Sequence, residues 1–200
     1  SGQYPPGSTY KLVVAAAALE EGLITPDTAF HCNGSFTLGN RTFRCWQKHG
    51  HGRVSLHRAI VSSCDVYFYN LGKLLGVDKI AHYARAFGFG EITGIDLLRE
   101  KGGTIPTRDW KLARFKTPWQ PGETISIAIG QGYNTATPLQ LALAYGALAN
   151  GGTVWRPRVV RQIESIDGKV VQAFPPEKKS VLPISEKNRL LLRDALWGVV

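Results

Sequence analysis

The feature that most constrains the fold is the stretch YPPGSTYK at residues 4–11, which is followed directly by the apolar run LVVAAAAL. Two prolines hold the backbone extended and the glycine permits a tight turn, so a helix can begin only after them. From Ser8 to Gly22 nearly all residues are helix formers or small apolar residues, and a glycine is a typical helix end. The sequence therefore predicts a helix with Ser8 at its N-terminus.

Ser8 and Lys11 are three residues apart, so on a helix their side chains leave the same face one turn from each other. A serine hydroxyl is a poor nucleophile unless a base takes its proton, and a neighbouring amine can do so. The helix N-terminus adds N–H groups that favour the oxyanion formed when a serine attacks a carbonyl. The pattern alone is frequent by chance, and in the alternative interpretation Ser8 caps the helix and Lys11 is solvated.

Residues 23–54 are rich in Gly, Thr and aromatic residues and predict short strands and loops. A helix capped by Ser55 is expected to end near residue 63, a second helix to start at Asp65, and a third to be capped by Asp78. Residues 63–65 then fall at a break between two helices.

The second half of the chain begins with a glycine-rich stretch, residues 88–124, that is expected to be irregular, and residues 124–132, TISIAIGQG, alternate like a strand. A helix follows with Thr137 as N-cap, a proline at its first position and a glycine stop. Asp167-Gly168 predicts a hairpin turn, and Ser185 caps a final helix. The mixture predicts a single α/β or α+β body with helices around a sheet.

The formal net charge of +9 suits a polyanionic neighbour such as nucleic acid, phospholipid or cell-wall polymer. The basic residues are spread along the chain, however, and no nucleic-acid-binding motif occurs, so we expect no nucleic-acid partner. The longest apolar run, residues 12–19, is far shorter than the roughly 20 residues that span a bilayer.

Three blocks of the sequence carry a family resemblance: YPPGSTYK, SSCDVYFYN and PGETISIAIGQGYNTATPLQLALAYGALANGG. Together they resemble the transpeptidase domain of the class B high-molecular-weight penicillin-binding proteins, and most closely the penicillin-binding protein 2 group that works in cell elongation. Serine acyltransferases of this superfamily use Ser-x-x-Lys, Ser-x-Asn (or Asp) and Lys-Thr-Gly. The first two stand here as Ser8–Lys11 and Ser63–Asp65, and the third is absent from residues 1–200.

The resemblance implies a penicillin-binding protein/serine β-lactamase-like fold of class α/β (α+β), with helices around an antiparallel sheet. Because the Lys-Thr-Gly strand lies further downstream in relatives, we expect residues 1–200 to form a single partial transpeptidase domain, truncated before that strand. It also implies an inner-membrane anchor upstream, a domain facing the periplasm, and a membrane-embedded glycan polymerase of the elongation machinery as partner.

The resemblance further implies a peptidoglycan D,D-transpeptidase that needs no cofactor for catalysis. Ser8 would attack the penultimate D-alanine carbonyl of a peptidoglycan stem peptide, Lys11 would be the base, and Ser63 would relay a proton to the leaving group. A β-lactam would acylate Ser8. The alternatives are a D,D-carboxypeptidase or β-lactamase, in which water reaches the acyl-enzyme, and a non-enzymatic β-lactam sensor or scaffold.

Asp65 departs from the commoner asparagine of the second motif. A carboxylate near Lys11 favours the charged ammonium, which works against a neutral-amine base. In the alternative interpretation Asp65 is a helix N-cap that merely faces the site.

Three cysteines and one histidine follow the spacing C-x12-C-x5-H-x12-C, formed by Cys32, Cys45, His51 and Cys64. Three thiolates and an imidazole make a closed tetrahedral zinc set, and such sets are structural rather than catalytic. The rival histidine ligands are His31, His49 and His57. Because disulfides persist in the periplasm, one disulfide with a leftover thiol is an alternative, as are three unlinked cysteines. A bound zinc would tether the loops of residues 30–51 to the element that contains Ser63 and Asp65.

Overall fold

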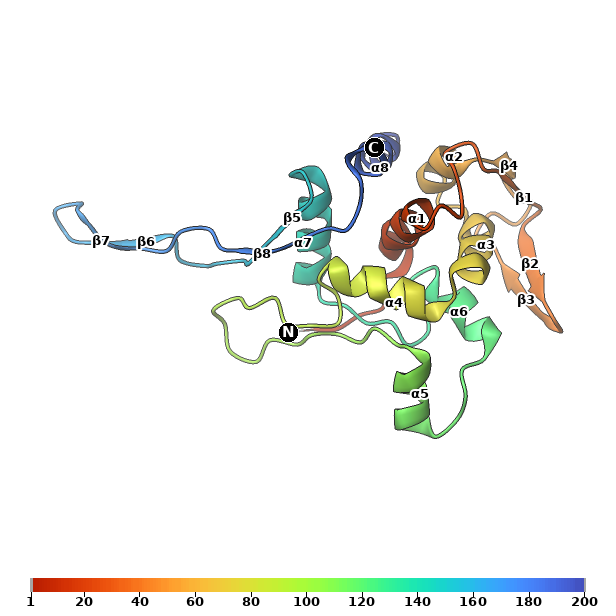
Figure 1. Cartoon of the computed structure of the whole chain (residues 1–200), viewed down its shortest axis with the longest axis horizontal. Coiled ribbons are helices and arrows are strands. Elements are labelled where there is room, and N and C mark those ends of the chain that lie inside the picture. The colour runs from red at the N-terminus through yellow and green to blue at the C-terminus, as the bar shows by residue number, and fades with distance from the viewer. Residues whose placement is uncertain (1, 200) are drawn as a thin grey trace.

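Helix α1 (Lys11–Glu20) lies at the centre of the molecule in the computed structural model, which describes residues 2–199 (Figure 1). Every residue from Lys11 to Leu19 is buried, because α1 packs against α3 (Asp65–Leu75), α4 (Val77–Ala86) and α8 (Glu186–Trp197). Its run of alanines lets these neighbours approach closely on several sides. The predicted helix is confirmed, but it ends at Glu20 and is preceded by the 3₁₀ helix η1 (Gly7–Tyr10), so Ser8 lies one turn before α1.

Four further helices lie between residues 56 and 149. They are α2 (Leu56–Val61), α5 (Arg108–Phe115), α6 (Pro121–Ile127) and α7 (Pro138–Ala149). The strands are β1 (Phe30–Cys32), β2 (Ser35–Leu38), β3 (Arg41–Arg44), β4 (Gly52–Val54), β5 (Thr153–Trp155), β6 (Gln162–Glu164), β7 (Val170–Ala173) and β8 (Lys178–Val181).

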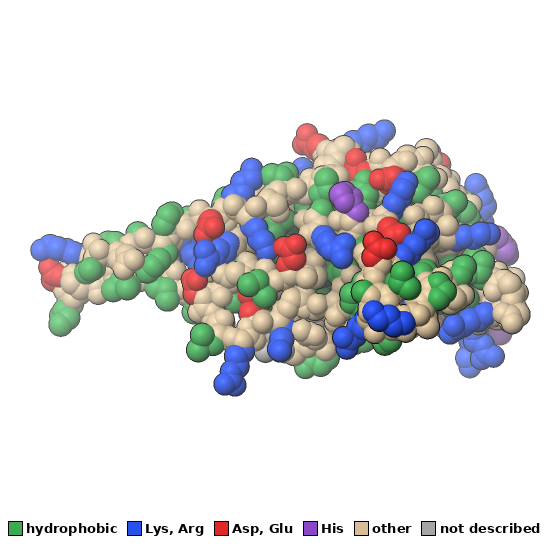
Figure 2. Space-filling view, turned by 60° about the horizontal axis from the view of Figure 1, so that its bottom comes forward, with side chains coloured by type: hydrophobic (Ala, Val, Ile, Leu, Met, Phe, Trp, Pro, Cys, Tyr) green, Lys and Arg blue, Asp and Glu red, His purple; other side chains and the backbone are tan. Residues whose placement is uncertain are grey.

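All strand pairs are antiparallel, which confirms the predicted mixture of helices with antiparallel strands. Within residues 2–199 the strands form four separate two-stranded ladders, β1–β4, β2–β3, β5–β8 and β6–β7, rather than one sheet enclosed by helices. The first two ladders lie beside α3, and the last two form an arm that projects from the body (Figure 1). Figure 2 shows the same arm, and on this face the Lys and Arg side chains are scattered rather than gathered into one patch.

The predicted break at residues 63–65 is confirmed, since α2 ends at Val61 and α3 begins at Asp65. The capping prediction for Asp78 is wrong, because Gly76, with φ +74°, occupies the N-cap of α4 and leaves Asp78 in the first turn. Ser55 stands at the N-cap of α2, but its side chain makes no capping hydrogen bond.

In the second half, the Thr137 cap of α7 is confirmed as a capping box with Gln140. Ser185 likewise accepts a hydrogen bond from the Asn188 amide at the start of α8. The Asp167-Gly168 turn joins β6 to β7 as predicted, with Gly168 at φ +79°.

The predicted strand at residues 124–132 is wrong, and most of that stretch belongs to α6 and the turn after it. Gln120 and Glu123 form a capping box, and Pro121 stands in the first turn, which together start a helix. Packing overrides the alternation of isoleucines, because Ile125 and Ile127 are buried in this short helix, which packs against α3. Helix α5, capped by Thr107, likewise falls in the stretch expected to be irregular.

Among the helices formed by residues 2–199, none combines the length and the apolar character needed to cross a membrane.

Candidate active site

Ser8 is exposed at the surface on η1, and the turn that presents it is held by three hydrogen bonds. The Gly7 amide donates to the Gly130 carbonyl at 2.9 Å, and Gly7 itself has φ +58°, as the predicted tight turn requires. The Thr9 hydroxyl donates to the Pro6 carbonyl, and the Tyr145 hydroxyl donates to the Thr9 carbonyl at 3.0 Å. Ser8 is therefore placed by contacts with α7 and with the turn after α6.

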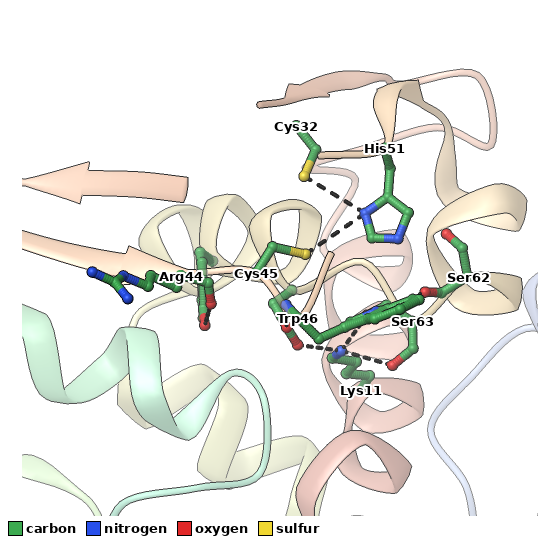
Figure 3. Close-up of polar contacts among 10 residues, drawn as sticks. Lys11, Cys32, Arg44, Cys45, Trp46, His51, Ser62 and Ser63 are labelled. Atoms are coloured by element: carbon green, nitrogen blue, oxygen red, sulfur yellow. Dashed lines mark hydrogen bonds and ion pairs between the residues drawn. The ribbon is translucent and has the colours of Figure 1, made fainter. Parts of the chain in front are cut away.

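Lys11 is buried in the first turn of α1, with its side chain 4% exposed, so the solvated alternative for this residue is wrong. Its Nζ donates to the Ser63 carbonyl and the Ser63 Oγ, both at 2.9 Å, and to Asp65 Oδ1 at 2.6 Å. The ammonium also lies 5.5 Å from the centroid of the Phe68 ring. A buried amine with three acceptors has a single well-defined position (Figure 3).

Asp65 is the first residue of α3, whose N-cap is Cys64, so the interpretation of Asp65 as a mere helix cap is wrong. One carboxylate oxygen pairs with Lys11, and the other accepts a hydrogen bond from the Trp46 amide at 3.0 Å. Ser63 adopts a left-handed backbone with φ +50°, which turns both its carbonyl and its hydroxyl toward Lys11. The structure thus brings Lys11, Ser63 and Asp65 together, as the motifs predict.

Ser8 joins this group through shared cavities rather than through a hydrogen bond. Within residues 2–199 its hydroxyl makes no hydrogen bond, but Ser8, Lys11 and Ser63 line one small pocket of about 190 Å³. On its other side Ser8 faces an open pocket of about 590 Å³, which Ser63 and Asp65 also line. The Ser8 hydroxyl is therefore accessible, while the Lys11 amine is held one helical turn further along the chain.

The walls of the larger pocket include residues that the sequence did not indicate: Arg44, Trp46, Tyr69, Ile129 and Gln131. Trp46 comes from the turn after β3, and the residue is 62% exposed. The neighbouring Cys45 is the one adjacent residue that the sequence marks as functional, and it is predicted as a metal ligand rather than as part of a pocket. Aromatic residues in a loop carry no periodicity that distinguishes a pocket wall from ordinary packing.

The predicted cysteine–histidine set is assembled beside this pocket. The ligand atoms of Cys32, Cys45, His51 and Cys64 all lie within 4.8 Å of one another, and within the described part of the chain the three thiols are free. His51 Nδ1 is 3.6 Å from the sulfurs of both Cys32 and Cys45 (Figure 3). The rivals His31, His49 and His57 are not in the group, and His57 instead pairs with Asp194 on α8.

The two nitrogen–sulfur separations in this group match those of a tetrahedral metal site. Zinc bonds of about 2.0–2.3 Å to nitrogen and sulfur place neighbouring ligand atoms about 3.5–3.8 Å apart, and both measured nitrogen–sulfur separations fall in that range. Burial raises the pKa of the Cys64 thiol to about 12, and burial together with the Arg58 charge lowers the pKa of His51. A neutral imidazole is ready to bind a cation, and a bound cation would stabilise the thiolates that burial disfavours.

The family model for the penicillin-binding protein transpeptidase domain matches residues 1–200. The chain belongs to this family. In this transpeptidase domain the two motifs anticipated from the sequence, Ser8–Lys11 and Ser63–Asp65, meet around one buried amine.

Named relatives and solved structures agree with this assignment. The chain is 47% identical to the peptidoglycan D,D-transpeptidase MrdA of Haemophilus influenzae, over 86% of this transpeptidase domain and 26% of that protein. It is similar to a peptidoglycan synthase complex that coordinates polymerization and crosslinking, at TM-score 0.87 and 37% identity, covering 99% of this chain and 33% of the other. It is also similar to PBP2 in its complex with MreC from Helicobacter pylori, at TM-score 0.83 and 36% identity, covering 98% and 34%. The chain therefore spans about a quarter to a third of these proteins.

Proposed function

We propose that this chain is the part of a peptidoglycan D,D-transpeptidase that carries the nucleophile, and that it crosslinks stem peptides during cell elongation. The observation that carries the proposal is the buried Lys11 amine, which is hydrogen-bonded to Ser63 and Asp65 and lines one pocket together with the exposed Ser8. This arrangement is what an acyl-serine mechanism needs: a free hydroxyl, an amine that can accept its proton, and a second hydroxyl to pass it on. The 47% identity to a named transpeptidase supports the same activity.

In the proposed reaction, Ser8 Oγ forms a bond to the carbonyl carbon of the penultimate D-alanine while the bond from that carbon to the last D-alanine nitrogen breaks. Lys11 in its neutral form takes the hydroxyl proton, and Ser63 passes a proton to the departing amine. An amine from a neighbouring stem peptide then attacks the acyl-serine and releases Ser8. The Asp65 carboxylate accepts a hydrogen bond from Lys11 Nζ at 2.6 Å and so helps to hold the amine beside Ser63.

The experiment that tests this proposal is intact-mass analysis after incubation with a penicillin, on the full-length protein, with Ser8→Ala beside it. We expect a long-lived adduct of one drug mass that is absent from the alanine variant. Rapid drug turnover would indicate a β-lactamase or a carboxypeptidase instead. If the folded protein forms no adduct, the acyl-serine reaction is refuted and a sensor or scaffold role takes its place.

We also propose that Cys32, Cys45, His51 and Cys64 hold a structural zinc ion. The fit of the nitrogen–sulfur separations to a tetrahedron supports it, as does the closed set of four ligands. Because Cys64 lies between Ser63 and Asp65, the metal would fix the second catalytic motif to the β1–β4 and β2–β3 ladders. Its role is to hold these residues in place, and the chemistry belongs to Ser8 and Lys11.

Metal analysis of protein purified without chelators tests the zinc proposal, with His51→Ala and the matched control His49→Ala, whose histidine is exposed and outside the group. About one zinc per chain is expected in the wild type and in the control, and much less in His51→Ala. If the wild-type protein contains no zinc and shows one reactive thiol, the zinc proposal is wrong and two of the cysteines form a disulfide instead.

We propose that the Lys-Thr-Gly strand follows this stretch in the full-length protein, that residues 1–200 are one partial domain, and that the whole is anchored in the inner membrane with this domain in the periplasm. The similarity to a peptidoglycan synthase complex supports a membrane glycan polymerase as partner. The similarity to a PBP2 bound to MreC supports membership in an envelope assembly. Stem peptides and β-lactams are the proposed ligands of the pocket beside Ser8.

A further inference from the structure

Trp46 is bonded to both ends of the Ser63–Asp65 motif, although it comes from a separate part of the chain. Its indole Nε1 donates to the Ser62 and Ser63 carbonyls, each at 3.1 Å. Its backbone amide donates to Asp65 Oδ2 at 3.0 Å. One residue therefore touches the first and the last residue of the motif, and Figure 3 shows its ring lying directly against Ser63.

The Ser63 backbone needs such support because it is strained. A non-glycine residue in the left-handed region costs about 1–2 kcal/mol and persists only where surrounding contacts hold it. Ser63 has φ +50°, and its carbonyl accepts from both Lys11 and Trp46. If the peptide relaxed to the right-handed region, the carbonyl would turn and Lys11 would lose one of its three acceptors.

The Trp46 amide acts on the other end of the motif by occupying one Asp65 oxygen. That bond leaves Oδ1 as the oxygen that faces Lys11 at 2.6 Å. The Lys11 amine is thus positioned by Ser63 and Asp65, and both of these residues accept a hydrogen bond from Trp46. The ring also meets His51 edge-on, with centroids 5.4 Å apart, and so lies between the cysteine–histidine group and the amine.

We propose that Trp46 is a positioning residue for the acylation step: its indole N–H holds the left-handed Ser63 so that the Ser63 carbonyl and hydroxyl fix the Lys11 amine beneath Ser8. This inference rests on the proposed acyl-serine function. Trp46 need not contact the reacting atoms, because it acts through Ser63 and Asp65. Its indole N–H is a donor that no other natural aromatic ring supplies with the same shape.

The test replaces Trp46 in the full-length protein by phenylalanine and, separately, by benzothienylalanine, which keeps the two-ring shape but has sulfur in place of the N–H. Trp155→Phe is the matched control, since Trp155 lies on β5 at the root of the arm. Stopped-flow acylation by a fluorescent penicillin over a concentration series separates the acylation rate constant from the dissociation constant of the first complex. Hydrogen exchange of residues 60–65 reports on the Ser63 backbone without any need for activity.

We expect both Trp46 variants to acylate about three- to tenfold more slowly, which is the value of one hydrogen bond, with the dissociation constant unchanged. Exchange at residues 60–65 should rise in both and stay at the wild-type level in Trp155→Phe. The benzothienyl variant is decisive, because it retains the ring against His51 and loses only the donor.

Three results would overturn the inference. A change in the dissociation constant alone would make Trp46 a wall of the substrate pocket. If a smaller fraction of the Trp46 variant is active but that fraction acylates at the wild-type rate, the role of Trp46 is purely structural. Unchanged exchange at residues 60–65 would show that the N–H does not hold Ser63. If the wild type itself is not acylated, the proposed function fails, and the exchange result alone then decides whether Trp46 holds Ser63.

Discussion

Gly130 provides the sharpest test of how Ser8 is placed, because an added methyl group at this position would clash with the turn that carries Ser8, the proposed nucleophile. Gly130 has φ +70°, and a Cβ built there would lie 2.2 Å from the Gly7 carbonyl oxygen and 2.8 Å from the Tyr10 Cβ. Backbone cannot yield as a flexible side chain can. The substitution Gly130→Ala must therefore displace Gly7, and with it Ser8.

Gly132 is a matched control two residues away. Its φ is +71°, but a Cβ there would meet only the Ile127 and Ser126 side chains, at 3.5 Å, which is ordinary contact. Each substitution lowers the free energy of unfolding by about 1–2 kcal/mol, because alanine is strained in the left-handed backbone. Gly130→Ala should lower it further, by about 1–3 kcal/mol from overpacking and about 1 kcal/mol from the loss of the hydrogen bond donated by the Gly7 amide.

The difference between the two variants is therefore about 2–4 kcal/mol, or a melting temperature at least about 4 °C lower for Gly130→Ala in a domain of this size. Thermal unfolding measures that difference, and acylation by a fluorescent penicillin shows whether Ser8 has moved. We expect Gly132→Ala to be acylated and Gly130→Ala to lose acylation even at temperatures where it is folded. Equal melting temperatures, or wild-type acylation of Gly130→Ala, would refute the reasoning.

Three further predictions concern the ion pair, one buried amide and the buried tyrosines. Asp65→Ala should lower the free energy of unfolding, measured with urea, by about 3–5 kcal/mol, because it leaves the Lys11 charge buried without its partner. Asp65→Asn should lower it by less, and equal losses in the two variants would contradict this prediction. Gln140→Leu should cost about 2–3 kcal/mol and speed hydrogen exchange in residues 88–102, since its amide donates to three carbonyls there. Burial raises the pKa of several tyrosines, to about 12 for Tyr83. Because these tyrosines lose their protons at lower pH in the unfolded chain than in the folded one, the free energy of unfolding should fall as the pH rises from about 10 toward 12. A urea midpoint that stays constant over that range would refute this prediction. The tyrosines concerned are Tyr10, Tyr67, Tyr69, Tyr83 and Tyr145.

The sequence predicts those parts of the site whose chemistry is local. Ser8 and Lys11 are one turn apart by spacing alone, and the break at residues 63–65 follows from capping signals on either side of it. Residue type and number also predict a cysteine–histidine set, although the sequence leaves His31, His49 and His57 as rival ligands that only the structure excludes. The first two depend on a few neighbouring residues, whereas the four ligand residues are spread from Cys32 to Cys64 and are brought together only by the fold.

The remainder depends on contacts between distant segments. Helix α6 was predicted as a strand because its isoleucines alternate, and only its packing against α3 reveals why a helix is preferred. The separate two-stranded ladders depend on which strands meet, which no single segment determines. Trp46 is 17 residues from Ser63 along the chain, and nothing in its own neighbourhood predicts a bond to that carbonyl.

The placement of Lys11 explains why the Ser-x-x-Lys pattern is common while the site is not. The pattern requires one helical turn, but the geometry found here also requires a strained left-handed backbone at Ser63, with φ +50°, and glycines at two positions that other residues could occupy only at a cost: Gly7 at φ +58° and Gly130 at φ +70°. Each of these residues is held by a bond to another segment, from Gly7 to Gly130 and from Trp46 and Lys11 to Ser63. A chain that carries the motif without these partners would relax, because nothing would offset the strain. The reactive geometry is therefore a property of the packed fold, and substitutions far from Ser8 in sequence should abolish acylation while leaving both motifs intact.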